Sequence, residues 1–120
     1  IQTQNSTMWH YVTDGENTVP ANHDFRTLID PMTFVCVDKS GSRIMIAEID
    51  GRQVGFSIGV NAEEVTEIAL RLGAWNSTRF DGGGSSAMWA KKDGVSGLVS
   101  SPSDRKGERS CMNYMYVRKK

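Results

Sequence analysis

One segment of this 120-residue chain repeats its apolar residues at helical spacing, and it constrains the fold more than any other. Asn61 can cap the free N–H groups of a first turn, and Glu64, three residues on, can complete a capping box. Gly73 can close the last turn in the left-handed conformation. We therefore predict one amphipathic helix over residues 61–72, because its apolar residues share one face: Val65, Ile68, Ala69 and Leu72.

Short β-rich runs surround this helix. Residues 33–37 and 43–49 are separated by a polar turn, which predicts a β-hairpin, and apolar residues then alternate over 54–58 as in a half-buried third strand. Residues 1–30 are expected to be mostly irregular. We predict an α+β fold with a mostly antiparallel or mixed β-sheet and the helix packed on it, the further short strands being at 8–12, 77–80, 87–90, 95–99 and 111–117.

The bulk composition excludes several function classes. Lys and Arg balance Asp and Glu at 14 each, and no basic stripe interleaved with aromatic residues indicates nucleic-acid binding. No run of about 18 apolar residues predicts a membrane-spanning segment. Cys36 and Cys111 have no neighbouring histidine, which argues against zinc, and they are either buried free thiols or a single bridge.

Residues 81–86 read Asp-Gly-Gly-Gly-Ser-Ser and connect two predicted strands. Three adjacent glycines cost about 2–3 kcal/mol of extra backbone ordering entropy relative to alanine, so we expect a specific need for them. Glycine lets a ligand approach the backbone closely, and successive N–H groups in such a loop can bind an anion. Asp81 adds a carboxylate, and Ser85 and Ser86 add hydroxyl donors. The loop therefore suits a phosphate ester.

The same six residues have a simpler interpretation as a loose hairpin loop. The ordered grouping of an acid, glycines and hydroxyls favours the anion site over that interpretation. Two better-known motifs do not fit. A Walker-type loop needs Lys after its last glycine, where this chain has Ser85, and a nucleophile elbow needs Gly two residues after the serine, where it has Ala87 or Met88.

Two other features of the sequence are possible parts of a site. Residues 101–109 form a polar, turn-rich cluster that is either a solvated surface loop or a mobile wall contributing Asp104 and Arg109. The two histidines, His10 and His23, have no spaced partner and are expected at the surface rather than as catalytic bases. We therefore do not expect a His-dependent triad.

Taken in order, several segments resemble the C-terminal half of the phosphodiester glycosidase family. The resemblance covers about residues 31–117, while the family's N-terminal half has no counterpart here. It implies that residues 1–120 are a single domain that forms the C-terminal part of a larger one, with the missing N-terminal half as a partner. The matching segments are residues 37–41, 48–52, the helix 61–72, residues 81–86 and 101–104, and Arg109 with Asn113.

Two departures from the family pattern lead to a hypothesis. Family members usually have Pro-Arg-Thr where this chain has Pro31-Met32-Thr33, and Asn where it has Arg79. Residues two apart on a strand share a face, so Arg79 should point the same way as Asp81. We hypothesise that Arg79 supplies the phosphate-binding charge lost at Met32; the alternative is that both changes mark a different substrate or a weakened activity.

The resemblance implies hydrolysis of a sugar phosphodiester, such as one carrying N-acetylglucosamine. Asp81 would be the acid/base or electrostatic group, and a second carboxylate would be Asp50 or Asp104. The implied catalytic residues are Asp81, Ser85 and Ser86. The implied substrate-binding residues are Arg79, Gly82, Gly83, Gly84, Asp104, Arg109 and Asn113.

A second hypothesis is a non-catalytic module that binds a glycan or phosphorylated glycan on a bacterial surface. No cofactor is indicated, although Asp81, Asp104 and loop carbonyls could hold Ca²⁺ or Mg²⁺ through oxygen. The family includes bacterial exopolysaccharide-associated proteins, and the resemblance implies an extracytoplasmic location: periplasmic, at the cell surface or secreted.

Overall fold

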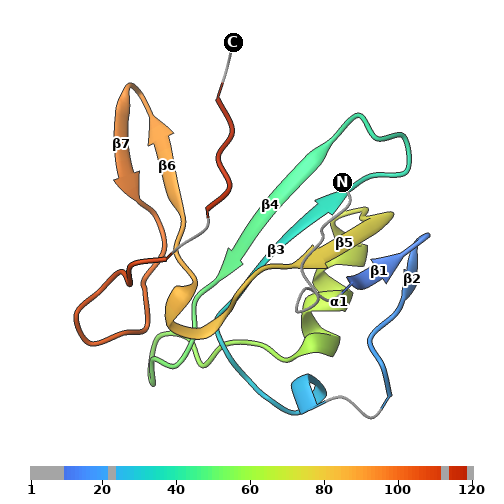
Figure 1. Ribbon diagram of the computed structural model, residues 1–120, viewed down its shortest axis with the longest axis horizontal. Coiled ribbons are helices and arrows are strands. Elements are labelled where there is room, and N and C mark those ends of the chain that lie inside the picture. The colour runs from blue at the N-terminus through green and yellow to red at the C-terminus, as the bar shows by residue number, and fades with distance from the viewer. Residues whose placement is uncertain (1–9, 22–23, 112–113, 119–120) are drawn as a thin grey trace.

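The computed structural model describes residues 10–21, 24–111 and 114–118. Within them lie a five-stranded sheet, a separate two-stranded hairpin, one α-helix and two short 3-10 turns (Figure 1), which confirms the predicted α+β class. In chain order the elements are β1 (His10–Thr13), β2 (Glu16–Asn17), η1 (Asp24–Arg26), β3 (Met32–Val37), β4 (Ile44–Ile49), α1 (Ala62–Arg71), β5 (Asn76–Arg79), η2 (Gly83–Ser85), β6 (Trp89–Lys92) and β7 (Val95–Leu98).

The five-stranded sheet has the order β2-β1-β5-β3-β4, and every neighbouring pair in it is antiparallel. The predicted hairpin is confirmed as β3 and β4, which pair from Met32 opposite Ile49 to Val37 opposite Ile44. β5 lies at the centre, hydrogen-bonded to β1 on one side and β3 on the other. The glycine loop, residues 81–86, begins shortly after β5 and therefore follows a strand that is hydrogen-bonded on both sides.

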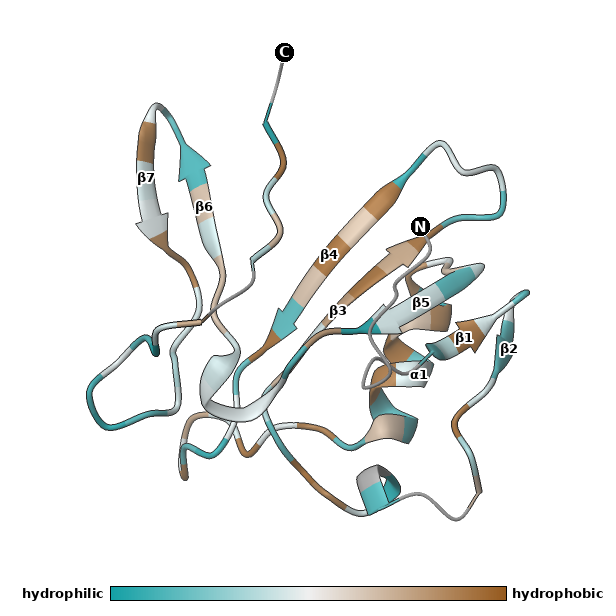
Figure 2. Ribbon diagram, in the orientation of Figure 1, coloured by the Kyte–Doolittle hydropathy of each residue, from teal (hydrophilic) through white to brown (hydrophobic). Residues whose placement is uncertain are grey.

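Helix α1 packs on one face of this sheet and forms the core with it. The capping box is present, since the Asn61 side chain accepts from the Glu64 N–H and the Glu64 carboxylate accepts from the Asn61 N–H. Gly73 follows with φ +84°, as predicted. Tyr11 and Phe34 meet edge to face, with ring centroids 6.4 Å apart. Hydrophobic residues concentrate on β3, β4 and the helix (Figure 2), and the buried cluster is Tyr11, Val12, Val19, Met32, Phe34, Cys36, Ala62, Val65, Ala69 and Ala74.

The buried face of the helix is rotated slightly from the predicted one. Val65 and Ala69 are buried and Ile68 is partly buried, but Leu72 is exposed at the C-cap. Thr66 is buried instead, which the helix tolerates because its hydroxyl donates to the carbonyl of Ala62 at 2.7 Å.

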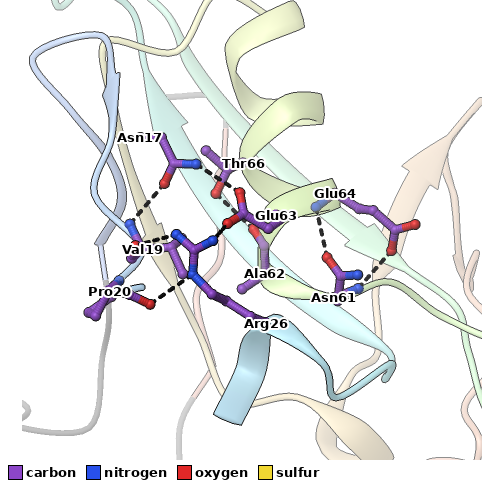
Figure 3. A network of polar contacts seen from close by, with 9 residues as sticks. All are labelled: Asn17, Val19, Pro20, Arg26, Asn61, Ala62, Glu63, Glu64 and Thr66. Carbon is purple, nitrogen blue, oxygen red and sulfur yellow. Dashed lines mark hydrogen bonds and ion pairs between the residues drawn. The ribbon is translucent and has the colours of Figure 1, made fainter. Parts of the chain in front are cut away.

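The opening segment is tied to the first turn of α1 by a polar network (Figure 3). Arg26 forms an ion pair with Glu63 and donates to the carbonyls of Val19 and Pro20, both at 2.8 Å. Asn17 donates to the second oxygen of the Glu63 carboxylate at 2.9 Å. This segment contains β1, β2 and η1, so the prediction that residues 1–30 are mostly irregular holds only in part, and residues 1–9 lie outside the described part.

The prediction of a third strand over residues 54–58 is wrong. Residues 54–58 form an exposed turn, with Val54 98%, Phe56 68% and Ile58 63% exposed. The segment doubles back through an isolated bridge between Gln53 and Ser57, and the N–H groups of Phe56 and Ser57 both donate to the carbonyl of Gln53. The segment therefore closes on itself as a turn and does not pair with β4, which stays an edge strand within the described residues.

The C-terminal part confirms the strands predicted near 87–90 and 95–99 and departs from the other expectations. β6 and β7 form a hairpin outside the main sheet (Figure 1), and residues 111 and 114–118 form no strand. Both cysteines are free, but only Cys36 is buried and Cys111 is exposed, so the expected burial of Cys111 is wrong. No helix in the described residues is long and apolar enough to cross a membrane.

Candidate functional site

The glycine loop begins two residues after β5 ends and folds back against the start of β3. The N–H of Gly83 donates to the carbonyl of Pro31 at 2.9 Å, and the N–H of Ser86 donates to the carbonyl of Gly83 at 3.1 Å. Gly83 and Gly84 are buried, and Gly83 has φ +62°, which favours glycine. The loop is therefore an ordered, packed turn and not a loose hairpin connection.

A different arginine guanidinium lies against each of the three glycines. A Cβ built on Gly82 would be 3.2 Å from Nη2 of Arg79, one on Gly83 would be 2.9 Å from Nη2 of Arg52, and one on Gly84 would be 2.6 Å from Nη2 of Arg109. Contacts below 3.0 Å do not occur for real Cβ atoms, so side chains at the last two positions would displace the arginines. The three glycines leave room for three cationic groups.

Two of these arginines are held by carboxylates in the same way. Arg52 donates from Nε and Nη2 to the two oxygens of Asp30 at 2.6 and 3.0 Å, and Arg109 donates from the same two nitrogens to Asp104 at 2.9 and 3.2 Å. The Asp104 carboxylate also lies against Gly84. Bidentate pairs of this kind fix the plane of the guanidinium as well as its position.

Residues 101–109 are attached to the loop that follows β4. The Ser101 N–H donates to Oδ1 of Asp50 at 2.6 Å, and its hydroxyl and carbonyl both bond to the side chain of Gln53 at 2.8 and 2.6 Å. This anchoring, together with the contacts of Asp104 and Arg109 at Gly84, favours the interpretation of the segment as a wall of the site over that of a free surface loop.

Arg79 and Met32 are neighbours, as the substitution hypothesis requires. Met32 is fully buried, and its sulfur would lie 3.5 Å from a Cβ on Gly82, which also contacts Arg79. Tyr11 donates to the same sulfur at 3.6 Å. Burial raises the pKa of Tyr11 to about 12, and the positive charge of Arg79 lowers it in part. A residue at position 32 and Arg79 can therefore reach the same edge of the loop.

The prediction that Arg79 and Asp81 share a strand face does not apply. β5 ends at Arg79, so the two-residue repeat stops there. Asp81 is exposed, whereas Arg79 is half-buried. The carboxylate of Asp81 accepts from the N–H of Gly82 at 3.0 Å, which places it at the open side of the loop.

The two serines of the loop have different surroundings. Ser86 is buried, and its hydroxyl accepts from that of Thr33 on β3 at 3.3 Å. Ser85 is half-buried, and its carbonyl lies 3.8 Å from the sulfur of Cys111. Ser86 can thus fix the loop to the sheet, while Ser85 is the more accessible hydroxyl.

The carboxylates near the loop also differ in role. Asp104 sits beside Gly84, whereas Asp50 is engaged by the Ser101 N–H. Glu48, which stands opposite Thr33 in the hairpin, was not predicted as a site residue. Burial, with a smaller contribution from the charge of Asp50, raises the pKa of Glu48 to about 7.

The histidines, which were expected at the surface, and the predicted Asn113 do not contribute described contacts to this cluster. His10 is exposed, and its Nδ1 is 2.9 Å from the hydroxyl of Thr78. His23 and Asn113 are outside the described residues. Within the described ranges, no three His, Cys, Asp or Glu side chains are grouped to hold a metal ion.

Sequence reasoning missed Arg52, Asp30 and Thr33. Asp30 and Arg52 are 22 residues apart, and Arg52 follows an Asp-Gly pair that indicates only a turn. Arg52 also has φ +57°, which is uncommon for a side chain other than Asn or Asp. No local pattern pointed to this ion pair; Arg52 belongs to residues 48–52, one of the segments that resemble the family, but no site role was predicted for it.

Comparisons with known proteins agree with the resemblance. A family model for phosphodiester glycosidases matches residues 2–118, further toward the N-terminus than the motifs indicated. Among solved structures, the "Putative exported protein" of Burkholderia pseudomallei is 38% identical with a TM-score of 0.60, over 68% of this chain and 14% of that one. A hypothetical protein from Synechocystis is 26% identical with a TM-score of 0.51, over 63% of this chain and 15% of that one.

No curated protein matches the chain. The chain thus spans about one seventh of the length of each of the two solved structures. The family match, by contrast, extends over nearly all of its residues. On this evidence the chain belongs to the phosphodiester glycosidase family.

Proposed function

We propose that the protein is a hydrolase that cleaves the bond between a sugar's anomeric carbon and a phosphate oxygen. The observation that carries this proposal is the packing of guanidinium groups against successive glycines at 82–84. Cationic donors beside a close-approach backbone are suited to a phosphate group, because Arg pairs with phosphate oxygens through two parallel hydrogen bonds. Family membership supports the same substrate class.

The phosphate group is already a good leaving group in this reaction. Water adds to the anomeric carbon, the bond from that carbon to the phosphate oxygen breaks, and the products are the free sugar and a phosphate monoester. Charge develops on the sugar ring and on the departing phosphate, so fixed charges aimed at both are the main requirement. Arg79 and Arg109 would stabilise the phosphate.

Asp81 is proposed as the acid/base or electrostatic group, because it is exposed at the open side of the loop where a sugar can reach it. Of the two carboxylates considered as its partner, Asp104 lies against Gly84 and is the better placed. Ser85 would contact the substrate, and Ser86 would hold the loop on Thr33. Asn113 remains a proposed substrate-binding residue on the resemblance alone.

The wider setting is proposed on the same basis. The related Burkholderia protein is described as exported, which supports an extracytoplasmic location for this one. The family's N-terminal half is proposed to complete the site, since this chain spans a small share of its relatives.

Release of phosphate monoester from N-acetylglucosamine 1-(methyl phosphate) tests the proposal. The full chain should turn the substrate over, Asp81→Asn should reduce the rate at least about a hundredfold, and Asp14→Asn, in the β1–β2 turn, should not change it. Equal rates for the parent and Asp81→Asn would refute the assignment of Asp81.

A second function, a non-catalytic phosphoglycan-binding module, is favoured by one observation. Met32, which stands where family members usually have arginine, is fully buried and makes a sulfur contact with Tyr11. Binding of the same compound without turnover in the parent would support the module. Turnover would rule it out.

A further inference from the structure

We propose that Arg52 is a phosphate-binding residue that forms, with Arg109, a two-guanidinium clamp across Gly83 and Gly84. This inference rests on the proposed function and deepens it, because that function assigned the phosphate to Arg79 and Arg109. It names a third residue for the same ligand, the phosphate group of a sugar phosphodiester.

The position of the Arg52 guanidinium is the first observation. A Cβ on Gly83 would lie 2.9 Å from Nη2, 3.1 Å from Cζ and 3.1 Å from Nη1 of Arg52. Three similar distances mean that the flat face of the guanidinium covers Gly83. A phosphate bound on this side of Gly83 would therefore lie beside the guanidinium of Arg52.

The count of hydrogen-bond donors is the second observation. A guanidinium has five N–H groups, and Asp30 accepts two of them, one from Nε and one from Nη2. No residue in the described part of the chain accepts from Nη1 of Arg52. Arg109 is bound to Asp104 through the same two nitrogens, and Arg52 and Arg109 are 48% and 49% exposed. Within the described residues, both arginines therefore keep their Nη1 donors for a ligand, over adjacent glycines.

The third observation is the unfavourable backbone conformation in which Arg52 is held. Its φ of +57° lies in the left-handed region, which costs about 1–2 kcal/mol for a residue other than glycine. The backbone is kept there by the bond from the Arg52 N–H to the carbonyl of Ile58 at 3.1 Å and by packing of Gly51 and Gly59 on residues 30–31. An ordinary surface ion pair does not need this fixed geometry, whereas a preorganised anion site does.

Electrostatics are consistent with a permanent clamp. The hydrogen bond that Arg52 donates to Asp30 is the largest influence on the pKa of Arg52 and raises it, and the charge of Asp104 raises it further. The two ion pairs are therefore close enough to influence each other. The Arg52 guanidinium therefore keeps its positive charge for an anion.

Calorimetric binding of inorganic phosphate tests the clamp separately from turnover. Arg52→Gln alone would leave Asp30 buried and unpaired, so the informative pair is Asp30→Asn and the double variant Asp30→Asn/Arg52→Gln. Asp30→Asn keeps Arg52 and should bind phosphate within about threefold of the parent, while the double variant should bind about tenfold or more weakly. Arg71→Gln, which removes an exposed arginine paired with Glu67 on the helix, is the matched control and should bind like the parent.

The outcomes for the clamp and for the hydrolase can be distinguished. Equal phosphate affinity of Asp30→Asn and the double variant, or a parent that does not bind millimolar phosphate, would overturn the clamp. Loss of phosphate binding in the double variant, in a protein that never turns over the sugar phosphodiester, would support the clamp and refute only the hydrolase. Unfolding midpoints measured on the same samples must agree between the two variants, and a drop confined to the double variant that accounts for the binding loss would also overturn it.

Discussion

Replacing Gly83 by alanine tests whether the glycine loop is built around the Arg52 guanidinium. The backbone at Gly83 has φ +62°, so an alanine there costs about 1–2 kcal/mol of unfolding free energy for the left-handed conformation alone. The added Cβ would also lie 2.9 Å from Nη2 of Arg52, closer than real Cβ atoms approach. Arg52 must then shift and lose part of its bidentate pairing with Asp30.

The chain contains a matched control for the backbone contribution. Gly41 has φ +72°, and no atom lies within 4 Å of a Cβ built there. Gly41→Ala should therefore cost only the backbone term of about 1–2 kcal/mol, whereas Gly83→Ala should cost about 1 kcal/mol more, a modest value because Arg52 is half-exposed. The difference between the two variants isolates the contact with the guanidinium.

Urea unfolding followed by circular dichroism measures both free energies. Repeating Gly83→Ala in the Asp30→Asn/Arg52→Gln background should remove the extra cost, because the contact is then absent. If Gly83→Ala and Gly41→Ala are equally destabilising in the parent, Arg52 does not rest on Gly83. The three-guanidinium description of the loop would then be wrong.

Three further predictions concern the sheet and the helix. Burial raises the pKa of Glu48 from 4.5 to about 7, so the stability that its protonated form contributes is fully present below pH 4.5 and is lost as the pH rises through 7. In urea unfolding at pH 8, Glu48→Gln should therefore raise the free energy of unfolding by about 1 kcal/mol over the parent, after allowance for solvent screening. The control Glu16→Gln should not raise it. Asn61→Ala removes the N-cap of α1 and should cost about 1 kcal/mol by the same measurement, with an unchanged midpoint contradicting the capping box. Phe34→Ala opens a cavity in the fully buried centre and should cost about 3–5 kcal/mol in thermal or urea unfolding, whereas a loss below 1 kcal/mol would contradict its place in the core.

The sequence predicted elements whose contacts are local. The capping box joins Asn61 and Glu64 within one helical turn, and the β3–β4 hairpin needs only the turn over residues 38–43. The Asp-Gly-Gly-Gly-Ser-Ser segment also stood out by itself, because three consecutive glycines carry an entropic cost that a packed domain does not bear without a use for it.

The predictions that failed depend on how segments pack on the sheet. The alternation over 54–58 indicated a strand, but the segment forms an exposed turn and leaves β4 as an edge strand of the described sheet, because an apolar pattern does not specify whether a neighbouring strand edge is used. The burial of Thr66 and the exposure of Leu72 likewise depend on how the helix lies on the sheet.

The helix, the hairpin and the residues of the glycine loop can thus be predicted from the sequence, because neighbouring residues in the chain specify each of them. The surroundings of that loop depend instead on how distant segments pack together. Asp30 and Arg52 form an ion pair although 22 residues separate them, and Arg109, which follows the β6–β7 hairpin in the chain, lies against Gly84. Such contacts form when separate segments pack together, and pairing of opposite charges at that separation leaves no periodic trace in the chain.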